Sequence, residues 1–373
     1  MTEVIYRPGL EGIIAGETAI AAVEQTGLSY RGYGIEDLAN NTTFEEVAHL
    51  LIYGELPTAS QLDALKGALD EFRPLAPGVV TALRQIPADA HMMDVLRTGV
   101  SMAGHFDPTR GTDPDGLRRR AVWLSAQCAS LVAARYRLIN GREPLSARPG
   151  LSHAGQILYQ CLGQNPDATA ARLLDLTLIL YAEHEFNAST FTARIVASTL
   201  SDMVSAVSAG IGALKGPLHG GANEAAMNML KQFNAPDEAT AWLRGQFAKK
   251  GKVMGFGHRV YKQGDHRAHI LEAELRKLAH EKGQTKWMEI YDAIKEPMVN
   301  EKKIFPNVDY PCGLTYFLLG LPVDMYTPLF VCSRVTGWCA HVIEQQLNNR
   351  LIRPLSRYTG TQSRKVVPIA QRS

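Results

Sequence analysis

The sequence is poor in cysteine, in net charge and in long apolar runs. Its 373 residues include five cysteines, an odd number without a CxxC pair, which argues against a disulfide framework or a zinc ribbon. Lys and Arg total 39 against 37 Asp and Glu, so the net charge of +2 gives no broad basic field for nucleic acid or an anionic membrane. We therefore expect a cytoplasmic protein with free thiols and with no nucleic-acid or membrane partner.

No apolar stretch has the length of a membrane span. Residues 203–214 are apolar and rich in small side chains, but they fall well short of the ~20 residues that a bilayer requires. The first twenty residues contain three acids and no apolar core, so neither a secretory signal nor a transit peptide is predicted. The small residues of 203–214 favour close helix packing, either in the core or between subunits.

Most of the chain has helical periodicity. Hydrophobic residues make up 46% of the sequence, enough for a buried core, and the length predicts two domains. Residues 43–46 form a capping box before apolar residues at helical spacing, and residues 268–282 separate apolar from charged side chains. Only residues 12–33 contain short β-branched runs, which predict one or two small hairpins. The sequence therefore predicts an all-α protein.

Two histidines stand among glycines. His219 lies in residues 216–223 (GPLHGGAN) and His258 in residues 255–259 (GFGHR). Glycine allows backbone and ligand to approach closely, so both histidines are candidates for an exposed site. A single such residue is more often a hydrogen-bonded structural histidine. The pair strengthens the case for a site, and both interpretations stay open.

Charged residues near these segments suit a small acidic substrate. A helix is expected directly after His219, and its dipole would favour a neutral imidazole. Arg267, Arg334 and Arg353 carry guanidinium forks that match carboxylates, although each alone is more often part of a surface ion pair. Asp309 lies in a proline-bounded apolar segment, where a carboxylate is either a base of raised pKa or a turn cap.

Metal and nucleotide motifs are missing. No two histidines have the HExxH spacing, and His266 and His269 have no set of Cys or carboxylate ligands beside them. The glycines at 255 and 257 lack the third glycine of a dinucleotide-binding turn, and no Walker motif occurs. We expect neither a metal site nor a nucleotide cofactor.

Taken together, these segments resemble the citrate synthase family. The match covers essentially the whole chain in family order, through residues 7–12, 30–33, 46–51, 216–223, 255–262, 306–309, 334–338 and 353–356. The resemblance implies a catalytic triad of His219, His258 and Asp309. It also implies an oxaloacetate site made by His184, Asn187, Arg267, Arg334 and Arg353, the last from the neighbouring subunit. Lys262 would lie on the coenzyme A side.

The resemblance also carries an expectation for the architecture. Residues 1–218 and 314–373 would form a large helical domain, and residues 219–313 a small domain that closes over the substrates. The chain resembles the shorter, homodimeric members with shared active sites. One departure concerns residues 265–267, which read Asp-His-Arg where many members have Asp-Pro-Arg, and this predicts a different shape for the loop around Arg267.

The activity implied is that of citrate synthase, which condenses acetyl-CoA with oxaloacetate and water to give citrate and CoA. Asp309 would deprotonate the acyl group while neutral His219 hydrogen-bonds the enolate oxygen and His258 polarises the ketone. No metal or redox cofactor is implied, since the CoA thioester is a substrate. One alternative is 2-methylcitrate synthase acting on propionyl-CoA, which residues 181–190 resemble at least as well. A non-catalytic ligand-binding scaffold is another, disfavoured because all three triad residues are present.

Overall fold

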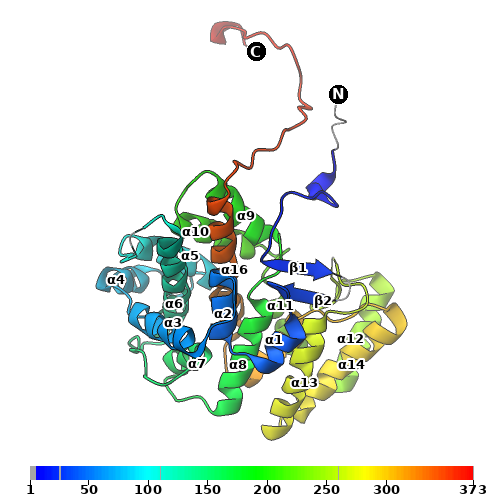
Figure 1. Ribbon diagram of the computed structural model, residues 1–373. Coiled ribbons are helices and arrows are strands. Elements are labelled where there is room, and N and C mark those ends of the chain that lie inside the picture. Colours follow the sequence, from blue (N-terminus) through cyan, green and yellow to red (C-terminus); the bar gives the residue numbers. More distant parts are fainter. Residues whose placement is uncertain (1–5, 25–26, 110, 259, 373) are drawn as a thin grey trace.

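The computed structural model describes residues 6–24, 27–109, 111–258 and 260–372. Regular structure in these residues is almost entirely helical (Figure 1), which confirms the predicted all-α class. The sixteen α-helices of the described residues are α1 (Ile35–Asn41), α2 (Phe44–Tyr53), α3 (Ala59–Phe72), α4 (Pro77–Gln85), α5 (Met92–Gly104), α6 (Pro114–Ile139), α7 (His153–Leu162), α8 (Ala168–Tyr181), α9 (Ala188–Ser198), α10 (Met203–Leu214), α11 (Ala222–Leu230), α12 (Pro236–Lys249), α13 (His266–Glu281), α14 (Thr285–Lys302), α15 (Asp309–Leu318) and α16 (Tyr326–Leu347). Short 3-10 turns occur at Pro8–Leu10, Val323–Met325 and Ile369–Gln371.

A small antiparallel sheet precedes the helices, as the runs in residues 12–33 predict. Its strands are β1 (Ala21–Glu24), β2 (Gly27–Tyr30) and β3 (Tyr33–Gly34), paired in that order. Tyr30 at the end of β2 is fully buried, and its hydroxyl lies 3.0 Å from the Glu183 carbonyl oxygen, to which it donates a hydrogen bond. The sheet is thereby fastened to the segment that follows α8.

Local sequence signals account for the helix ends. In α2, Thr43 and Glu46 form the expected capping box, and Gly54 ends the helix in the left-handed conformation with φ 98°. The helix predicted for residues 268–282 is α13, which begins two residues earlier because Asp265 accepts a hydrogen bond from the Arg267 amide and so caps it.

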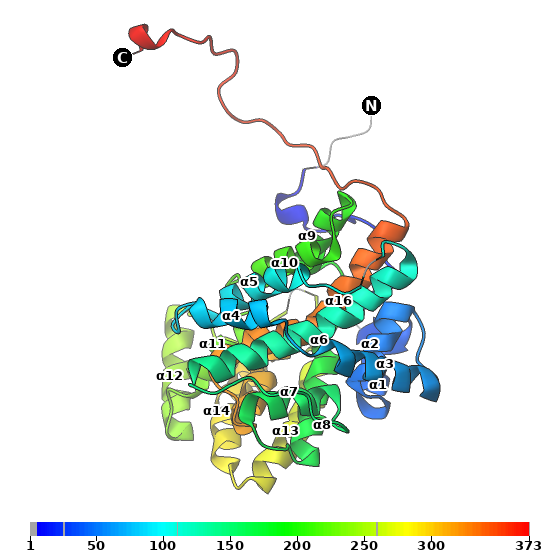
Figure 2. The same cartoon turned by 90° about the vertical axis from the view of Figure 1, so that its left-hand side faces the viewer.

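Helices α6 and α16 form the centre of one helical group (Figure 2). Helix α16 packs against α6, α9, α2 and α8, and its Trp338 is fully buried. Helix α10 packs against α9, α5 and α16, and a Cβ on Gly210 would lie 3.1 Å from the Trp338 ring. The small residues of 203–214 therefore do allow close packing within the chain.

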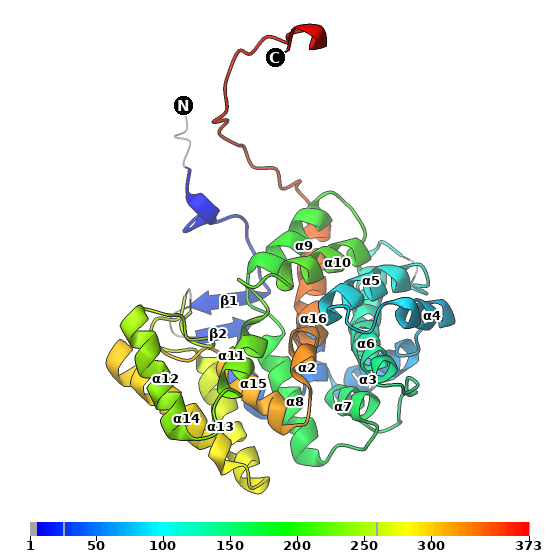
Figure 3. The same ribbon diagram turned by 180° about the vertical axis from the view of Figure 1, so that it is seen from behind.

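Helices α11 to α15 form a second group, which packs on α8 and α16 and lies toward the other side of the molecule from α3, α6 and α7 (Figure 3). Helices α11 and α15 approach closely, because a Cβ on Gly313 would lie 2.8 Å from the Asn223 carbonyl oxygen. Helix α15 runs through residue 313 to Leu318, so the expected domain boundary falls inside a helix. The division into two moving domains stays a prediction.

The C-terminal segment leaves the helical body as an extended tail (Figures 1 and 2). Arg353 lies in this tail, and so does Leu355, which is 80% exposed. All five cysteines are buried free thiols. Among the described helices, none combines the length and the apolar character needed to cross a bilayer.

Candidate active site

His219 lies in the turn between α10 and α11, where one serine fixes its ring. The Ser189 amide donates a hydrogen bond to Nε2 of His219 at 3.3 Å, so this nitrogen is an acceptor and the neutral ring carries its proton on Nδ1. Ser189 Oγ also lies 2.8 Å from Nε2 and accepts a hydrogen bond from Trp338 Nε1 at 3.1 Å. Helices α9 and α16 thus set both the tautomer and the orientation of His219.

His258 has the opposite tautomer. Its Nδ1 accepts hydrogen bonds from the backbone amides of Val260 and Tyr261, at 3.1 and 3.2 Å. The neutral ring therefore carries its proton on Nε2. The ring stacks on Tyr261 with 4.4 Å between centroids, and it meets the His184 ring edge-on at 5.2 Å.

Backbone pairing holds the His258 segment against the start of α15. The Gly257 amide donates to the Phe305 carbonyl at 2.8 Å, and the Asn307 amide donates to the Gly255 carbonyl at 2.9 Å. Gly255 has φ 81°, and a Cβ there would lie 2.8 Å from the Cβ of Tyr310. The glycine is therefore required for this approach, which brings the segment before His258 next to the residues before Asp309.

All three candidate histidines are neutral near pH 7. Burial, and second the charge of Arg334, lower the pKa of His219 to about 4. Burial, and second the charge of Arg267, lower the pKa of His258 to about 4. For His184, burial and both arginines hold the pKa well below its usual value. The predicted neutral His219 is thus found, with burial and the charge of an arginine as the causes of its low pKa.

Two buried arginines supply this positive field. Arg267 is 4% exposed and forms a two-point ion pair with Asp265, with N–O distances of 3.0 and 2.8 Å. Burial acts to lower the pKa of Arg267, but Asp265 more than offsets this and raises it. His266, the departure noted in the sequence, is exposed and leaves the buried ion pair intact.

Arg334 projects from α16 and is only 2% exposed. Its Nε donates a hydrogen bond to the Tyr181 carbonyl at 2.8 Å, and its guanidinium lies 4.9 Å from the centroid of the Phe330 ring. Burial lowers the pKa of Arg334. A buried guanidinium in this setting is stabilised by any carboxylate that reaches it.

Asp309 is the first residue of α15. Its Oδ1 accepts a hydrogen bond from the Tyr181 hydroxyl at 2.5 Å, and α15 itself has no side-chain cap. Burial raises the pKa of Asp309 to about 6, although Tyr181 and the two arginines oppose the shift. The first of the two interpretations, a carboxylate of raised pKa, therefore describes this residue.

The remaining predicted residues have more varied positions. Asn187 caps α9, where its Oδ1 accepts from the Thr190 amide at 3.0 Å. Lys262 is exposed, and its Nζ donates to the His258 carbonyl at 3.3 Å. Arg353 is exposed and lies in the C-terminal segment that follows α16.

Sequence reasoning assigned no role to two residues that the structure places at the site. Ser189 orients His219, and Tyr181 contacts Asp309. Both occur in residues 181–190, yet no spacing or motif there distinguishes them from ordinary helix-end residues.

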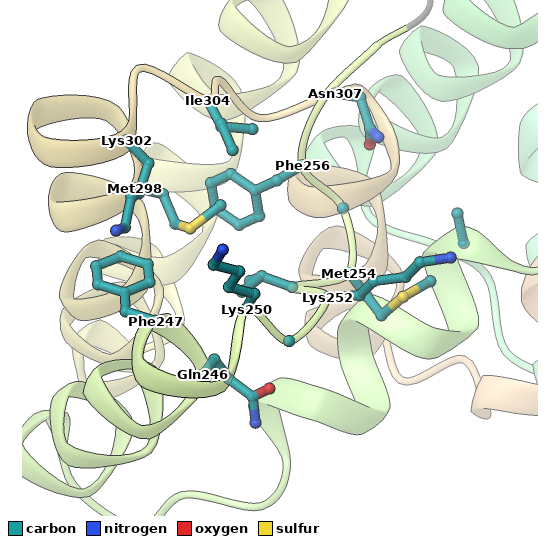
Figure 4. A pocket seen from close by; sticks show the side chains of 14 residues that line it. Gln246, Phe247, Lys250, Lys252, Met254, Phe256, Met298, Lys302, Ile304 and Asn307 are labelled. Atoms are coloured by element: carbon teal, nitrogen blue, oxygen red, sulfur yellow. The ribbon is translucent and has the colours of Figure 1, made fainter.

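A cavity of about 620 Å³ lies beside the segment that leads to His258 (Figure 4). Its wall is mainly apolar, and three lysines also line it; the labelled lining residues are Gln246, Phe247, Lys250, Lys252, Met254, Phe256, Met298, Lys302, Ile304 and Asn307. Lys302 Nζ lies 4.4 Å from the centroid of the Phe247 ring. Within the described residues, no group of three His, Cys, Asp or Glu side chains is placed to hold a metal ion.

Comparison with known proteins gives the family. The model of the citrate synthase C-terminal domain matches residues 9–355. The chain is 44% identical to 2-methylcitrate synthase 1 of Corynebacterium glutamicum over all of both chains. It is 46% identical to 2-methylcitrate synthase of Shewanella oneidensis, over 98% of this chain and 97% of the relative. It is 41% identical to citrate synthase 2 of Bacillus subtilis, over 98% of this chain and 99% of the relative.

A solved structure gives the same result. The citrate synthase of Thermoplasma acidophilum, in a ternary complex with carboxymethyl coenzyme A and oxaloacetate, matches with a TM-score of 0.92 at 34% identity, over 98% of each chain. The chain belongs to the citrate synthase family, as its sequence motifs suggest. It is an enzyme of the acyltransferase type.

The hydrogen bond from Tyr181 generates a prediction for the pKa of Asp309. Because this bond stabilises the carboxylate, Tyr181→Phe should raise the pKa of Asp309 above about 6, by roughly one unit for a charge-assisted bond. Carbon-detected NMR of the Asp309 carboxyl measures the change. Tyr316→Phe is the matched control, because the Tyr316 hydroxyl is buried but bonds to Thr177. An unchanged pKa in Tyr181→Phe would show that this contact is absent in solution.

Proposed function

We propose that this enzyme condenses a short acyl-CoA thioester with oxaloacetate and hydrolyses the product to release CoA. The observation that carries the proposal is the pairing of two neutral histidines of opposite tautomer with a half-buried carboxylate of raised pKa, all within the field of two buried arginines. This set of groups matches what carbon–carbon bond formation through an enolate requires.

In the first step, the Asp309 carboxylate removes a proton from the carbon next to the thioester carbonyl. The carbonyl oxygen then gains negative charge and accepts a hydrogen bond from Nδ1–H of His219. A pKa of about 4 keeps this histidine a neutral donor throughout. Since a general base works best with a pKa near the working pH, the raised pKa of Asp309 favours proton removal.

In the second step, the enolate carbon attacks the ketone carbon of oxaloacetate. Nε2–H of His258 donates a hydrogen bond to the ketone oxygen, which takes the electron pair of the C=O π bond as the new carbon–carbon bond forms. This oxygen gains one proton to become the hydroxyl of the product, which balances the proton that Asp309 took from the acyl group. Water then cleaves the thioester bond and releases CoA. The chemistry proceeds with side chains alone, and CoA acts as a substrate rather than a resident cofactor.

Oxaloacetate binding follows from the buried charges. Its carboxylates would pair with Arg267 and Arg334, whose guanidinium groups are already desolvated. His184 Nε2 is buried without a hydrogen-bond partner in the described residues, so it can bond the same substrate. Asn187 would act mainly by holding the start of α9 in place.

The thioester would lie along the segment between the 620 Å³ cavity and His258. Its apolar wall suits the carbon chain of CoA, and Lys250, Lys252 and Lys302 suit the phosphate groups. Lys262 lies on the same segment, beyond His258. We further propose that residues 219–313 close as a small domain over the large domain of residues 1–218 and 314–373 and exclude water until the new bond has formed.

The acyl group has two candidates. The sequence prediction is acetyl-CoA, which makes the enzyme a citrate synthase. Propionyl-CoA is the second candidate, because the relatives from C. glutamicum and S. oneidensis, at 44% and 46% identity, are named 2-methylcitrate synthases. One methylene in a pocket discriminates by only ~1–3 kcal/mol, so each substrate should react.

Replacing the triad should abolish turnover without unfolding the protein. We expect His219→Ala, His258→Ala and Asp309→Asn each to lower kcat by at least ~100-fold in a steady-state assay of CoA release. His280→Ala, at the end of α13, is the matched control and should retain full activity. Near-normal kcat in a triad variant would remove that residue from the mechanism.

Asp309→Asn also allows a stability readout. The folded-state pKa of about 6 exceeds the ordinary value of 3.8, so ionisation of Asp309 costs stability as the pH rises through this window. In the asparagine variant, this part of the pH dependence should disappear from the free energy of unfolding. A loss of activity without a loss of stability therefore points to chemistry rather than to unfolding.

The acyl preference is tested by comparing kcat/KM for acetyl-CoA and propionyl-CoA with oxaloacetate as co-substrate. We expect acetyl-CoA to be preferred, by less than ~200-fold. A ratio below one assigns the enzyme as a 2-methylcitrate synthase and leaves the triad in place. Turnover of neither thioester would contradict the proposed reaction.

The exposed position of Arg353 supports a homodimer with shared active sites. In that arrangement, Arg353 of the partner subunit completes the oxaloacetate site. Mixing Arg353→Ala with His258→Ala subunits should restore about a quarter of wild-type activity, because half of the dimers are hybrids with one intact site each. Mixing His219→Ala with His258→Ala is the control and should restore none. No recovery in the first mixture, once subunit exchange is demonstrated, would rule out sharing.

A further inference from the structure

Three aromatic rings form a cluster at the candidate active site. The His258 ring stacks on the Tyr261 ring, with 4.4 Å between the centroids and 22° between the planes. The His184 ring meets both of them edge-on, at 5.2 Å from His258 and 5.7 Å from Tyr261. His184 follows α8, whereas His258 and Tyr261 lie in the segment before α13. Of the three residues, Tyr261 alone has no role in the proposed reaction.

Tyr261 makes two separate contacts with His258. Its backbone amide donates a hydrogen bond to Nδ1 of His258 at 3.2 Å, and its ring lies against one face of the imidazole. The first contact needs only the backbone, and it sets the tautomer. The second contact needs the side chain. Because the outer torsion of a histidine side chain is broad, a ring stacked on the imidazole restricts the rotation that would turn Nε2–H away.

Tyr261 is itself held in place. The residue is only 4% exposed, and the guanidinium carbon of Arg267 lies 5.9 Å from the centroid of its ring. A cation at about 6 Å from an aromatic centroid is attracted to the ring. Arg267 is fixed in turn by its two-point ion pair with Asp265. The stack on His258 is therefore anchored to the start of α13.

The ring of Tyr261, rather than its hydroxyl, makes these contacts. The hydroxyl is buried without a hydrogen-bond partner in the described residues. Burial raises the pKa of Tyr261 to about 12, so the side chain is a neutral phenol at pH 7. Phenylalanine at this position would therefore keep the stack on His258.

The same ring helps to keep water from His258. Burial is the largest cause of the low pKa of His258; the charges of Arg267 and Lys262 also lower this pKa, and Asp265 raises it. Tyr261 lies in the field of Arg267 and Asp265, and also of Glu185. A neutral substitution of Tyr261 removes none of these charges, so its effect on the pKa of His258 reports the loss of cover.

We propose that Tyr261 is a positioning residue, which holds the His258 ring in the plane that aims Nε2–H at the ketone oxygen of the substrate. The proposal rests on the proposed function, since it is there that His258 polarises this ketone. Tyr261 acts through His258, and its aromatic ring is the part that is required.

Steady-state kinetics of two Tyr261 variants test the proposal. Tyr261→Leu removes the aromatic face, and we expect it to lower kcat by at least ~10-fold, because a misaligned donor forfeits catalysis. The KM for the acyl-CoA should stay unchanged, since the lost interaction belongs to the transition state. Tyr261→Phe should keep wild-type kcat. Tyr159→Leu is the matched control, because Tyr159 in α7 also lies near a guanidinium, that of Arg148 at 5.7 Å, and it should keep wild-type kcat as well.

Nitrogen NMR of His258 in the free enzyme gives a second readout that needs no turnover. The wild-type ring should titrate with a pKa of about 4. In Tyr261→Leu, water reaches the uncovered face, so this pKa should rise by about one unit, and in Tyr261→Phe it should not change. The tautomer should be the same in all variants, because the backbone amides of Val260 and Tyr261 still donate to Nδ1.

Wild-type kcat together with a wild-type pKa of His258 in Tyr261→Leu would overturn the proposal. An equal loss in Tyr261→Phe and Tyr261→Leu would also overturn it, because the hydroxyl would then be the required group. If Tyr261→Leu does not fold, Tyr261→Met takes its place with the same expectations. Absence of turnover in the wild type would contradict the proposed function alone, and the NMR difference between the two variants would still decide whether Tyr261 holds His258.

Discussion

The site depends on two buried guanidinium groups, those of Arg267 and Arg334. Their positive field, added to burial, keeps His184, His219 and His258 neutral and partly offsets the burial of Asp309. Burying such charges is costly unless they are paired. Asp265 pairs with Arg267, whereas Arg334 has the Tyr181 carbonyl and the Phe330 ring, which leaves it suited to a substrate carboxylate.

The fold brings the two arginines close to Asp309 from different helices. Arg334 comes from the central helix α16, and Arg267 and Asp309 come from the starts of α13 and α15. The end of α8 links the two helical groups, because Tyr181 bonds to Arg334 through its carbonyl and to Asp309 through its hydroxyl. The small sheet also holds the end of α8 in place, because the Tyr30 hydroxyl donates a hydrogen bond to the Glu183 carbonyl. Closure of one group over the other would therefore act directly on the contacts of Asp309.

Much of this could be predicted from sequence where the determinants are local. The capping box of α2, the apolar stripe of α13 and the glycines around His219 and His258 are all short-range signals. The hydrogen-bond partners of the site residues are distant in sequence. Ser189 lies 30 positions from His219, and Tyr181 lies 128 positions from Asp309. The periodicity of apolar residues along the sequence does not predict such long-range contacts. The cause of the low pKa of His219 was likewise missed, because burial and the charge of Arg334 exist only in the folded chain.

Nitrogen NMR of the histidine rings at pH 7 tests this account most directly, with His219 and His258 assigned through their glutamine variants. The account predicts two neutral rings of opposite tautomer, protonated on Nδ1 in His219 and on Nε2 in His258. A doubly protonated imidazolium at either position, or the same tautomer at both, would contradict it.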